Sequence, residues 1–481
     1  MGALGLTSVS VFKTIRTALR EEPETWLAYL HGQKFESLDH IKEAKPRFRG
    51  APLRVAIFFL RLVARSAVRY EPRGSGRRRV LAFAGTTNQR AALGSTVDAL
   101  ARRGVPVLAL SMPGVITQGD PMRRFQALRF GPVEVTKAIW LLMLRFRVLR
   151  RQLSNGHARL TARWLDTFCM PYVYLAYFER VLRQVQPSVV LVSNDHNAPN
   201  RSLLAVARAM GIKTAYMQHA SVSPLFPCLT MDYAFLDGKA ALECYRQCEA
   251  NRPPALSLPQ RHVFLTGQKK PLVVEGKTSE GVIGLALNTL DTPSDVAPVL
   301  DALTRTGGRL CVRWHPGLQG RKLEPLLAVL QRYPGVEQSD PNKEPVGPFL
   351  DRLNGLIAGN SSIHLEAALS GVVPVYFEFG KTRVSDYYGY VRHGLSIAAE
   401  SLEELVAVVR RIRGGQLSVN ADAVRYYSAT FATQWEGAEG ELVAGHLVSL
   451  LDGADPIDLW GFEALCGDGA EFLSIGKTGT D

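Results

Sequence analysis

The stretch Gly359-Asn360-Ser361-Ser362-Ile363-His364-Leu365-Glu366-Ala367-Ala368 decides the fold that the sequence predicts. It begins at the last residue of the apolar run 355–359, which has the length and composition of a buried strand, and its small polar residues open a predicted helix over 363–370. A strand, a short turn and a helix form one unit of an α/β fold. Free N–H groups and the positive end of the helix dipole meet at such a turn, which therefore suits a phosphate.

Four side chains of this stretch are candidates for binding a phosphorylated ligand. Asn360 and the hydroxyls of Ser361 and Ser362 lie at the helix start. Glu366 lies four residues beyond Ser362, so it shares that face of the helix and can reach a sugar hydroxyl. The alternative is that Ser361 only caps the helix, because serine is a leading N-cap residue.

A second candidate motif, Arg313-Trp314-His315-Pro316-Gly317, ends the predicted strand 309–314. Arg313 and His315 place a cation and an imidazole at the ligand edge, where negative charge builds up on a diphosphate leaving group. Lys381 follows the predicted strand 373–377 on the same edge. It either contacts donor phosphate or belongs to a solvated loop.

The whole chain of 481 residues is too long for one hydrophobic core, and its strands and helices alternate in two series. We expect a helical N-terminal region over 1–70, a Rossmann-like acceptor domain over 71–270, a Rossmann-like nucleotide-sugar domain over 271–455 and a tail over 456–481. The predicted fold class is α/β, with the two Rossmann-like domains facing across a cleft and the last helix crossing back to the first domain.

Two neighbouring strand ends of the first domain supply candidates for a general base. Asp195 and His196 follow the strand 189–192, and His219 follows the strand 213–217. A carboxylate or imidazole suits the removal of a proton from an acceptor hydroxyl, and Asp195 or His219 is the preferred residue. The alternative is that Asp195 caps the following helix and His219 is a hydrogen-bonded core residue.

The net charge of +13 comes largely from arginines in the first half of the chain. The stretches 53–69 and 139–153 look amphipathic and basic, which suits helices in the interface of an anionic membrane. The alternative is burial against the domain core with arginines that reach out to solvent. No apolar run reaches the length of a membrane span. No zinc-finger or RNA-binding pattern accompanies the basic residues, so nucleic acid is not an expected partner.

The His-Pro pair after one strand, and the Ser-Ser pair opening a helix with a glutamate one turn on, resemble motifs of bacterial GT-B-fold transferases that build surface polysaccharides. These include polysialyltransferases, capsule Kdo transferases and CDP-glycerol glycerophosphotransferases. The resemblance covers roughly residues 281–399 and implies that His315, Ser361 and Ser362 bind the donor phosphates. The Asp-Tyr-Ser-Ser form of the glycerophosphotransferases is Gly-Asn-Ser-Ser here, which argues against glycerol phosphate as the transferred group.

The expected function is therefore a metal-independent, inverting glycosyltransferase of bacterial capsule or lipopolysaccharide synthesis. It would use a CMP-, CDP- or UDP-linked sugar as donor, a glycan or lipid-linked acceptor, no cofactor and no metal site. The catalytic residues would be Asp195 or His219 together with His315. The expected location is the cytoplasm, including the inner face of the cytoplasmic membrane. The alternatives are an enzyme like the UDP-sugar 2-epimerases, or a non-catalytic scaffold in polysaccharide assembly.

Overall fold

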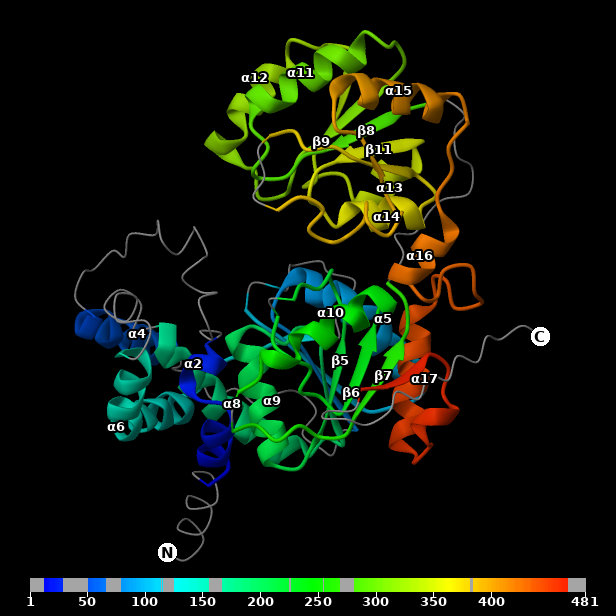
Figure 1. Ribbon diagram of the computed structural model, residues 1–481. Helices are drawn as coiled ribbons and strands as arrows, with labels where there is room; N and C mark the ends of the chain where they lie inside the picture. The colour runs from blue at the N-terminus through cyan, green and yellow to red at the C-terminus, as the bar shows by residue number, and fades with distance from the viewer. Residues whose placement is uncertain are drawn as a thin grey trace, which may run out of the picture.

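The computed structural model describes residues 13–28, 51–65, 79–113, 115, 125–154, 167–224, 226–253, 255–268, 281–380 and 384–465. These residues form two α/β domains, each built around its own sheet, with the second domain stacked over the first (Figure 1). All strand pairs are parallel except the pair that joins the last strand to the first sheet. Within this part of the chain, no helix is both long and apolar enough to cross a membrane.

The first sheet has eight strands in the order β14-β7-β6-β5-β4-β1-β2-β3. They are β1 (Val80–Ala84), β2 (Val107–Ser111), β3 (Phe125–Ala127), β4 (Val189–Val192), β5 (Lys213–Met217), β6 (Tyr233–Leu236), β7 (Arg261–Leu265) and β14 (Phe462–Leu465). The central strands are buried on both faces, which explains their continuous apolar runs.

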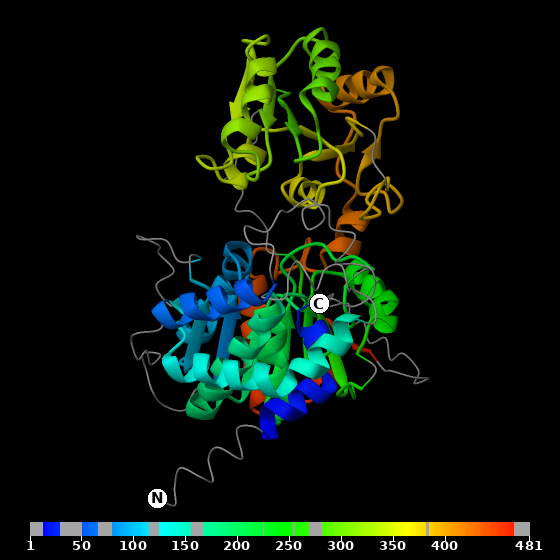
Figure 2. The ribbon, with the colours of Figure 1, turned by 90° about the vertical axis from the view of Figure 1, so that its left-hand side faces the viewer.

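Helices cover both faces of the first sheet (Figures 1 and 2). Leu81 and Phe83 of β1 pack with residues of α8, whereas Val80, Ala82 and Ala84 pack with residues of α5. The helices of this domain are α2 (Glu24–Leu27), α4 (Ala51–Arg65), α5 (Thr87–Arg102), α6 (Pro132–Ser154), α8 (Met170–Val185), α9 (Ala198–Ala209) and α10 (Lys239–Gln247).

The second sheet has six strands in the order β10-β9-β8-β11-β12-β13. They are β8 (Ile283–Ala286), β9 (Leu310–Arg313), β10 (Val336–Ser339), β11 (Gly355–Ala358), β12 (Val373–Tyr376) and β13 (Ile397–Ala398). The helices around them are α11 (Pro293–Thr304), α12 (Glu324–Leu330), α13 (Val346–Asp351), α14 (Ile363–Leu369) and α15 (Leu402–Arg413).

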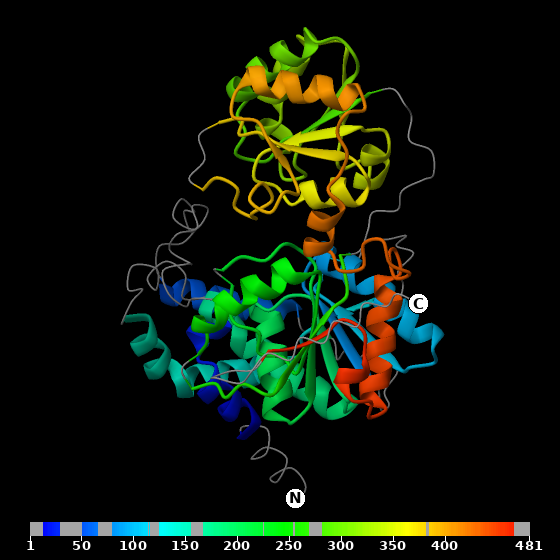
Figure 3. The ribbon, with the colours of Figure 1, turned by 45° about the vertical axis from the view of Figure 1, so that its right-hand side comes forward.

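The chain returns to the first domain after α15 (Figure 3). Helix α16 (Ala421–Tyr427) lies between the domains, and α17 (Glu439–Leu451) packs on α5. Gly440 allows this close approach, because a Cβ there would come within 2.6 Å of the Ser95 Cβ. Glu441 forms ion pairs with Arg102, the last residue of α5, and with Arg103, which follows it. Strand β14 then pairs with β7, so the end of the chain completes the first sheet.

The expected two-domain α/β fold of the GT-B type is confirmed by the two parallel sheets and their connection. The segment 423–451 looks like one helix in sequence but forms α16 and α17, separated by a turn in which Gly437 has a φ of 82°. Strand β14 lies where the sequence predicted only a tail. It is short, and it exists because β7 offers it an open edge.

Candidate functional site

The carboxyl ends of β5 and β6 and the loop after β12 border a cavity between the two domains. The cavity has a volume of about 320 Å³ and lies beside α16. Gln218 follows β5 and Asp237 follows β6 on the first-domain side, while Tyr387, Tyr390 and Arg392 line it from the second domain. Ligands of open parallel sheets bind at this edge, so the cavity and the strand ends around it form the candidate site.

The turn that opens α14 leaves its serine side chains largely unused for capping. Ser362 is the N-cap residue, and its hydroxyl caps no backbone N–H of the helix. The Ser361 hydroxyl accepts only a long bond of 3.4 Å from the Ile363 N–H. Both serines are partly exposed. The capping interpretation therefore accounts for little of this turn, and the hydroxyls remain available to a ligand.

Both ends of the Asn360 amide bind the loop after β12, and its predicted contact with the donor stays a prediction. Its Nδ2 donates to the Val384 carbonyl at 2.7 Å, and its Oδ1 accepts from the Tyr387 N–H at 2.8 Å. The Tyr387 hydroxyl in turn bonds Ser223 of the first domain at 2.5 Å. Asn360 thus connects the helix-opening turn to a contact between the domains.

His364 holds the same turn from beneath. Its Nε2 lies 2.9 Å from the Gly359 carbonyl and its Nδ1 lies 3.0 Å from the Ser396 hydroxyl, so Nε2 donates and Nδ1 accepts. The ring is fully buried, and burial lowers its pKa to about 4. His364 is therefore a neutral residue that positions the end of β11 and the turn that follows it.

Glu366 lies one turn into α14, as predicted, and its carboxyl is in an unusual environment. Burial raises its pKa to about 7, although the positive charge of Arg313 opposes the change. No hydrogen bond joins this carboxyl to another described residue, and the side chain retains partial exposure. A carboxyl whose pKa lies near 7 and whose oxygens accept no other hydrogen bond can bind a hydroxyl or accept a proton.

Arg313 and His315 differ in what they offer to a ligand. The buried Arg313 guanidinium donates to the Ser339 hydroxyl at 2.7 Å and to the Glu344 carbonyl at 3.0 Å, and it lies over the Phe349 ring. In this arrangement it supports the sheet edge and holds a positive charge near Glu366. His315 is exposed, and its Nδ1 accepts the Gly317 N–H at 2.9 Å. Because Nδ1 accepts this bond, Nε2 carries a proton and is a donor suited to a phosphate oxygen.

Strand β8 separates the two predicted motifs, because it lies between β9 and β11. The loop after β8 nevertheless touches both. A Cβ on Gly317 would lie 3.5 Å from Thr289, and one on Gly359 would lie 3.9 Å from Asn288. Sequence reasoning missed Asn288 and Thr289, although they directly follow the apolar run 281–287, which predicts a strand, and that position was the available signal.

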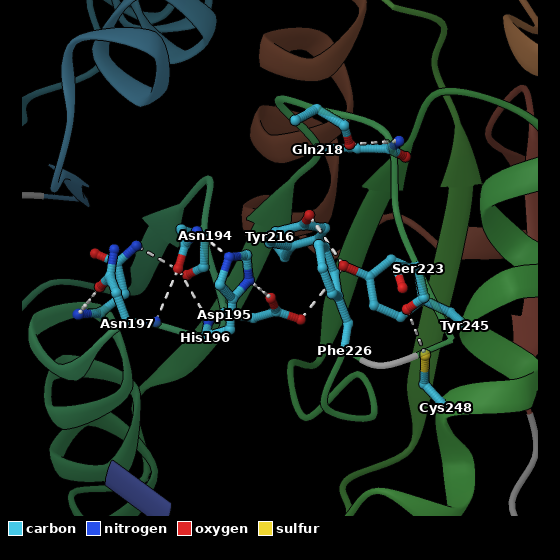
Figure 4. Close-up of polar contacts among 12 residues, drawn as sticks. Asn194, Asp195, His196, Asn197, Tyr216, Gln218, Ser223, Phe226, Tyr245 and Cys248 are labelled. Carbon is cyan, nitrogen blue, oxygen red and sulfur yellow. Dashed lines mark hydrogen bonds and ion pairs between the residues drawn. The ribbon is translucent and has the colours of Figure 1, made fainter. Parts of the chain in front are cut away.

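Asp195 and His196 form a closed polar network at the end of β4 (Figure 4). Asp195 Oδ1 lies 3.0 Å from His196 Nδ1, and its Oδ2 lies 3.3 Å from the Tyr245 hydroxyl. Asn194 Oδ1 accepts the His196 N–H, which leaves its Nδ2 to donate to His196 Nε2 at 3.1 Å. Asp195 is buried with both oxygens engaged, so it orients His196 in this conformation and does not face the cavity as a free base.

His219 lies close to the Asp195 and His196 pair, as the convergence of β4 and β5 predicts. Burial first, and the nearby His196 second, lower its pKa to about 4. Its Nδ1 is buried and has no hydrogen-bond partner in the part of the chain that the structure describes. The ring is neutral at pH 7, which is the form that a base requires.

Asp237 was not predicted and is the most deeply buried carboxyl on the cavity wall. Burial and the charge of Glu439 raise its pKa to about 8. Its carboxyl makes no hydrogen bond to another described residue, whereas its backbone N–H donates to Gln218. Its position directly after β6 was the signal that could have identified it.

Lys381 lies outside the described residues, so its predicted contact with the donor stays a prediction. Among the residues that the structure describes, no three His, Cys, Asp or Glu side chains come together as a set that could hold a metal ion. The roles predicted for His315, Ser361, Ser362 and Glu366 likewise stay predictions. The structure places these four side chains on the same edge of the second sheet.

Comparisons with known proteins show likeness at the level of the fold. No protein-family model matches the sequence, and no curated protein matches it. A protein from Listeria monocytogenes, assigned as a UDP-N-acetylglucosamine 2-epimerase, superposes with a TM-score of 0.50 at 13% identity, covering 79% of this chain and 98% of that one. MurG from Acinetobacter baumannii gives a TM-score of 0.42 at 14% identity, covering 78% and 99%. The wall teichoic acid polymerase TagF gives 0.44 at 10%, covering 87% and 98%.

Proposed function

We propose that this protein is a glycosyltransferase that moves a sugar from a nucleotide-sugar donor to a glycan or lipid-linked acceptor. The donor would bind to the second domain and the acceptor to the first. The proposed reaction is an inverting displacement without a metal ion, in the synthesis of a bacterial surface polysaccharide such as capsule or lipopolysaccharide. The donor would carry a CMP, CDP or UDP group.

The observation that carries the proposal is the turn 359–362, where two partly exposed serine hydroxyls open α14 and take part in little internal hydrogen bonding. Such a group of donors stabilises negative charge, which grows on the nucleotide phosphate as the glycosidic bond breaks. His315 Nε2 adds a further donor from the loop after β9. Glu366 would accept a hydrogen bond from a hydroxyl of the donor sugar or ribose.

The cavity beside α16 suits the acceptor. Tyrosine rings and two carboxyls, Asp237 and Glu243, line it from opposite sides. Aromatic faces pack against the apolar faces of sugar rings, and carboxyls accept hydrogen bonds from sugar hydroxyls. His219 is a neutral imidazole at the end of β5, and His196 lies at the end of the neighbouring strand β4. We propose His219 as the base, with Asp195 as the residue that positions the His196 ring beside it.

The test is donor consumption followed by NMR, with each nucleotide sugar supplied alone and then with an extract of bacterial glycolipids and glycans as acceptor. The transferase is expected to release free nucleotide only when acceptor is present, and to form a product of inverted anomeric configuration. His219→Ala should abolish turnover with little change in donor affinity. Release of nucleotide at the same rate with and without acceptor would contradict the proposal.

An epimerase is the second candidate, because a structure that superposes with a TM-score of 0.50 is assigned as a UDP-N-acetylglucosamine 2-epimerase. The same NMR experiment separates the two. An epimerase converts UDP-N-acetylglucosamine to its 2-epimer with no acceptor in the tube. Unchanged cell-surface polysaccharide after His315→Ala and Ser361→Ala would instead favour a non-catalytic scaffold.

A further inference from the structure

Helices α4 and α6 lie on the flank of the first domain, away from the second domain (Figures 1 and 2). The two helices pack against each other. Large apolar side chains on them point outward and remain exposed, and together they define the α4–α6 surface: Leu53, Leu60, Val63, Val133, Trp140, Met143, Leu144, Phe146 and Val148.

The exposed residues of α6 are continuous along the helix. Val133, Trp140, Met143 and Leu144 recur at helical spacing together with Arg147, so they form one stripe over four turns. Met143 is 63% exposed and Trp140 is 45% exposed. Isolated apolar residues on a surface need no explanation, but a contiguous group of this size marks an interaction site.

The inner face of α6 is already filled. Val135, Ala138, Leu141 and Leu149 are buried in the core of the first domain. Burial against the core, which the sequence left open as an alternative, therefore explains one face of the helix only. The exposed stripe lies outside this set of buried core residues.

The charges on these helices are almost all positive. Helix α4 contains three arginines and no acidic residue, and α6 contains four arginines, one lysine and a single acid. That acid, Glu134, is buried and paired with Arg180. Arg61 and Arg147 are exposed and form no ion pair with the residues that the structure describes. Neither helix therefore carries an exposed carboxylate that would repel an anionic partner.

We propose that the α4–α6 surface docks this protein onto an anionic lipid bilayer. A packed pair of helices with exposed Trp, Leu and Met side chains and with exposed arginines fits the boundary between lipid headgroups and acyl chains. Trp140 would lie at the headgroup level, where its amphipathic ring is favoured. This inference stands on the surface alone and does not depend on the proposed reaction.

The test is cosedimentation of the full chain with vesicles of phosphatidylcholine, with and without phosphatidylglycerol. Each arginine near an anionic surface contributes about fivefold in affinity, so Arg61 and Arg147 together account for roughly 25-fold. Binding should therefore favour the mixed vesicles and weaken as salt is added. This part of the test uses the unmodified protein, so it does not depend on how any variant folds.

Two variants and matched controls assign the binding to this surface. Arg61→Gln/Arg147→Gln should lose most of the preference for anionic vesicles, and Met143→Ser/Leu144→Ser should weaken binding to both kinds. The controls are Arg321→Gln/Lys322→Gln and Ile457→Ser, which change exposed residues elsewhere and should bind like the unmodified protein. Brominated lipid should quench tryptophan fluorescence, and Trp140→Phe should remove most of that quenching.

Three results would overturn the proposal. The first is no sedimentation with anionic vesicles at low salt. The second is sedimentation that both surface variants retain in full. The third is a dimer in analytical ultracentrifugation that Met143→Ser/Leu144→Ser dissociates while vesicle binding is absent, because the surface would then be covered by a second copy of this chain.

Discussion

The raised pKa of Glu366 leads to a stability prediction that can be worked out from the structure. Burial raises this pKa from 4.5 to about 7. The carboxyl of the folded protein therefore stays protonated where that of the unfolded chain has already ionised. Folding stability should fall as the pH rises from 4.5 through 7, and it should level off above pH 7.

Above pH 7 the folded protein must hold the ionised Glu366 carboxylate in a buried position, which lowers its stability. Glutamine carries no charge, so Glu366→Gln should stabilise the protein at high pH. A pKa difference of about 2.5 corresponds to roughly 3.4 kcal/mol at 1.36 kcal/mol per pKa unit. Because the side chain is partly exposed, we expect a gain of about 2 kcal/mol at pH 8.5 and about zero at pH 4.5. The same variant should lose activity, since a neutral amide cannot serve as the carboxylate does.

The assay is urea unfolding followed by circular dichroism at pH 4.5, 6, 7 and 8.5, with Glu403→Gln as control. Glu403 is exposed on α15, and its replacement should change stability equally at all four pH values. A Glu366→Gln variant that is less stable than the unmodified protein at pH 8.5 would refute the argument. A gain of the same size at every pH would refute it as well.

Three further predictions concern the turn, the connection between the domains and their contact. Ser361→Ala/Ser362→Ala should weaken binding of a nucleoside diphosphate by on the order of 100-fold in calorimetry, because each hydrogen bond to a charged group contributes about 1.5–3 kcal/mol. An unchanged affinity would show that the two serines do not bind the phosphates. Gly267→Ala should lower the melting temperature by several degrees, because Gly267 has a φ of 76° and an added Cβ would lie 1.7 Å from Thr430 Oγ1. A melting temperature equal to that of the unmodified protein would contradict this packing. Tyr390→Phe removes the 3.0 Å bond to Ser221 across the domains and should raise the radius of gyration in small-angle scattering; no increase would show that the bond does not hold the domains together.

The sequence predicts the fold well because buried parallel strands are continuous apolar runs that end in polar turns. The strand predicted at 355–359 and the helix predicted at 363–370 match β11 and α14 to within one residue. Edge strands were missed, since β10 reads Val-Glu-Gln-Ser and has the mixed character of a half-exposed segment. The positions of Ser361, Ser362 and Glu366 at the start of a helix could be read from spacing alone.

The environment of these residues could not be read from the sequence. Glu366 owes its pKa to burial and to Arg313, which lies on another strand. The guanidinium of Arg313 is engaged by Ser339 and the Glu344 carbonyl, groups that the sequence does not connect with it. Likewise, the amphipathic pattern of α6 cannot show that apolar residues occupy both faces, because only the tertiary structure determines which face is packed.

The central claim is that the turn opening α14 binds the phosphate of a nucleotide-sugar donor. Its most direct test is calorimetric titration of CMP, CDP, UDP, GDP and their sugars into the unmodified protein and into Ser361→Ala/Ser362→Ala. We predict that at least one nucleotide binds the unmodified protein and that the double variant loses most of this affinity. If none of these nucleotides binds, or if the double variant binds as tightly as the unmodified protein, the claim is contradicted.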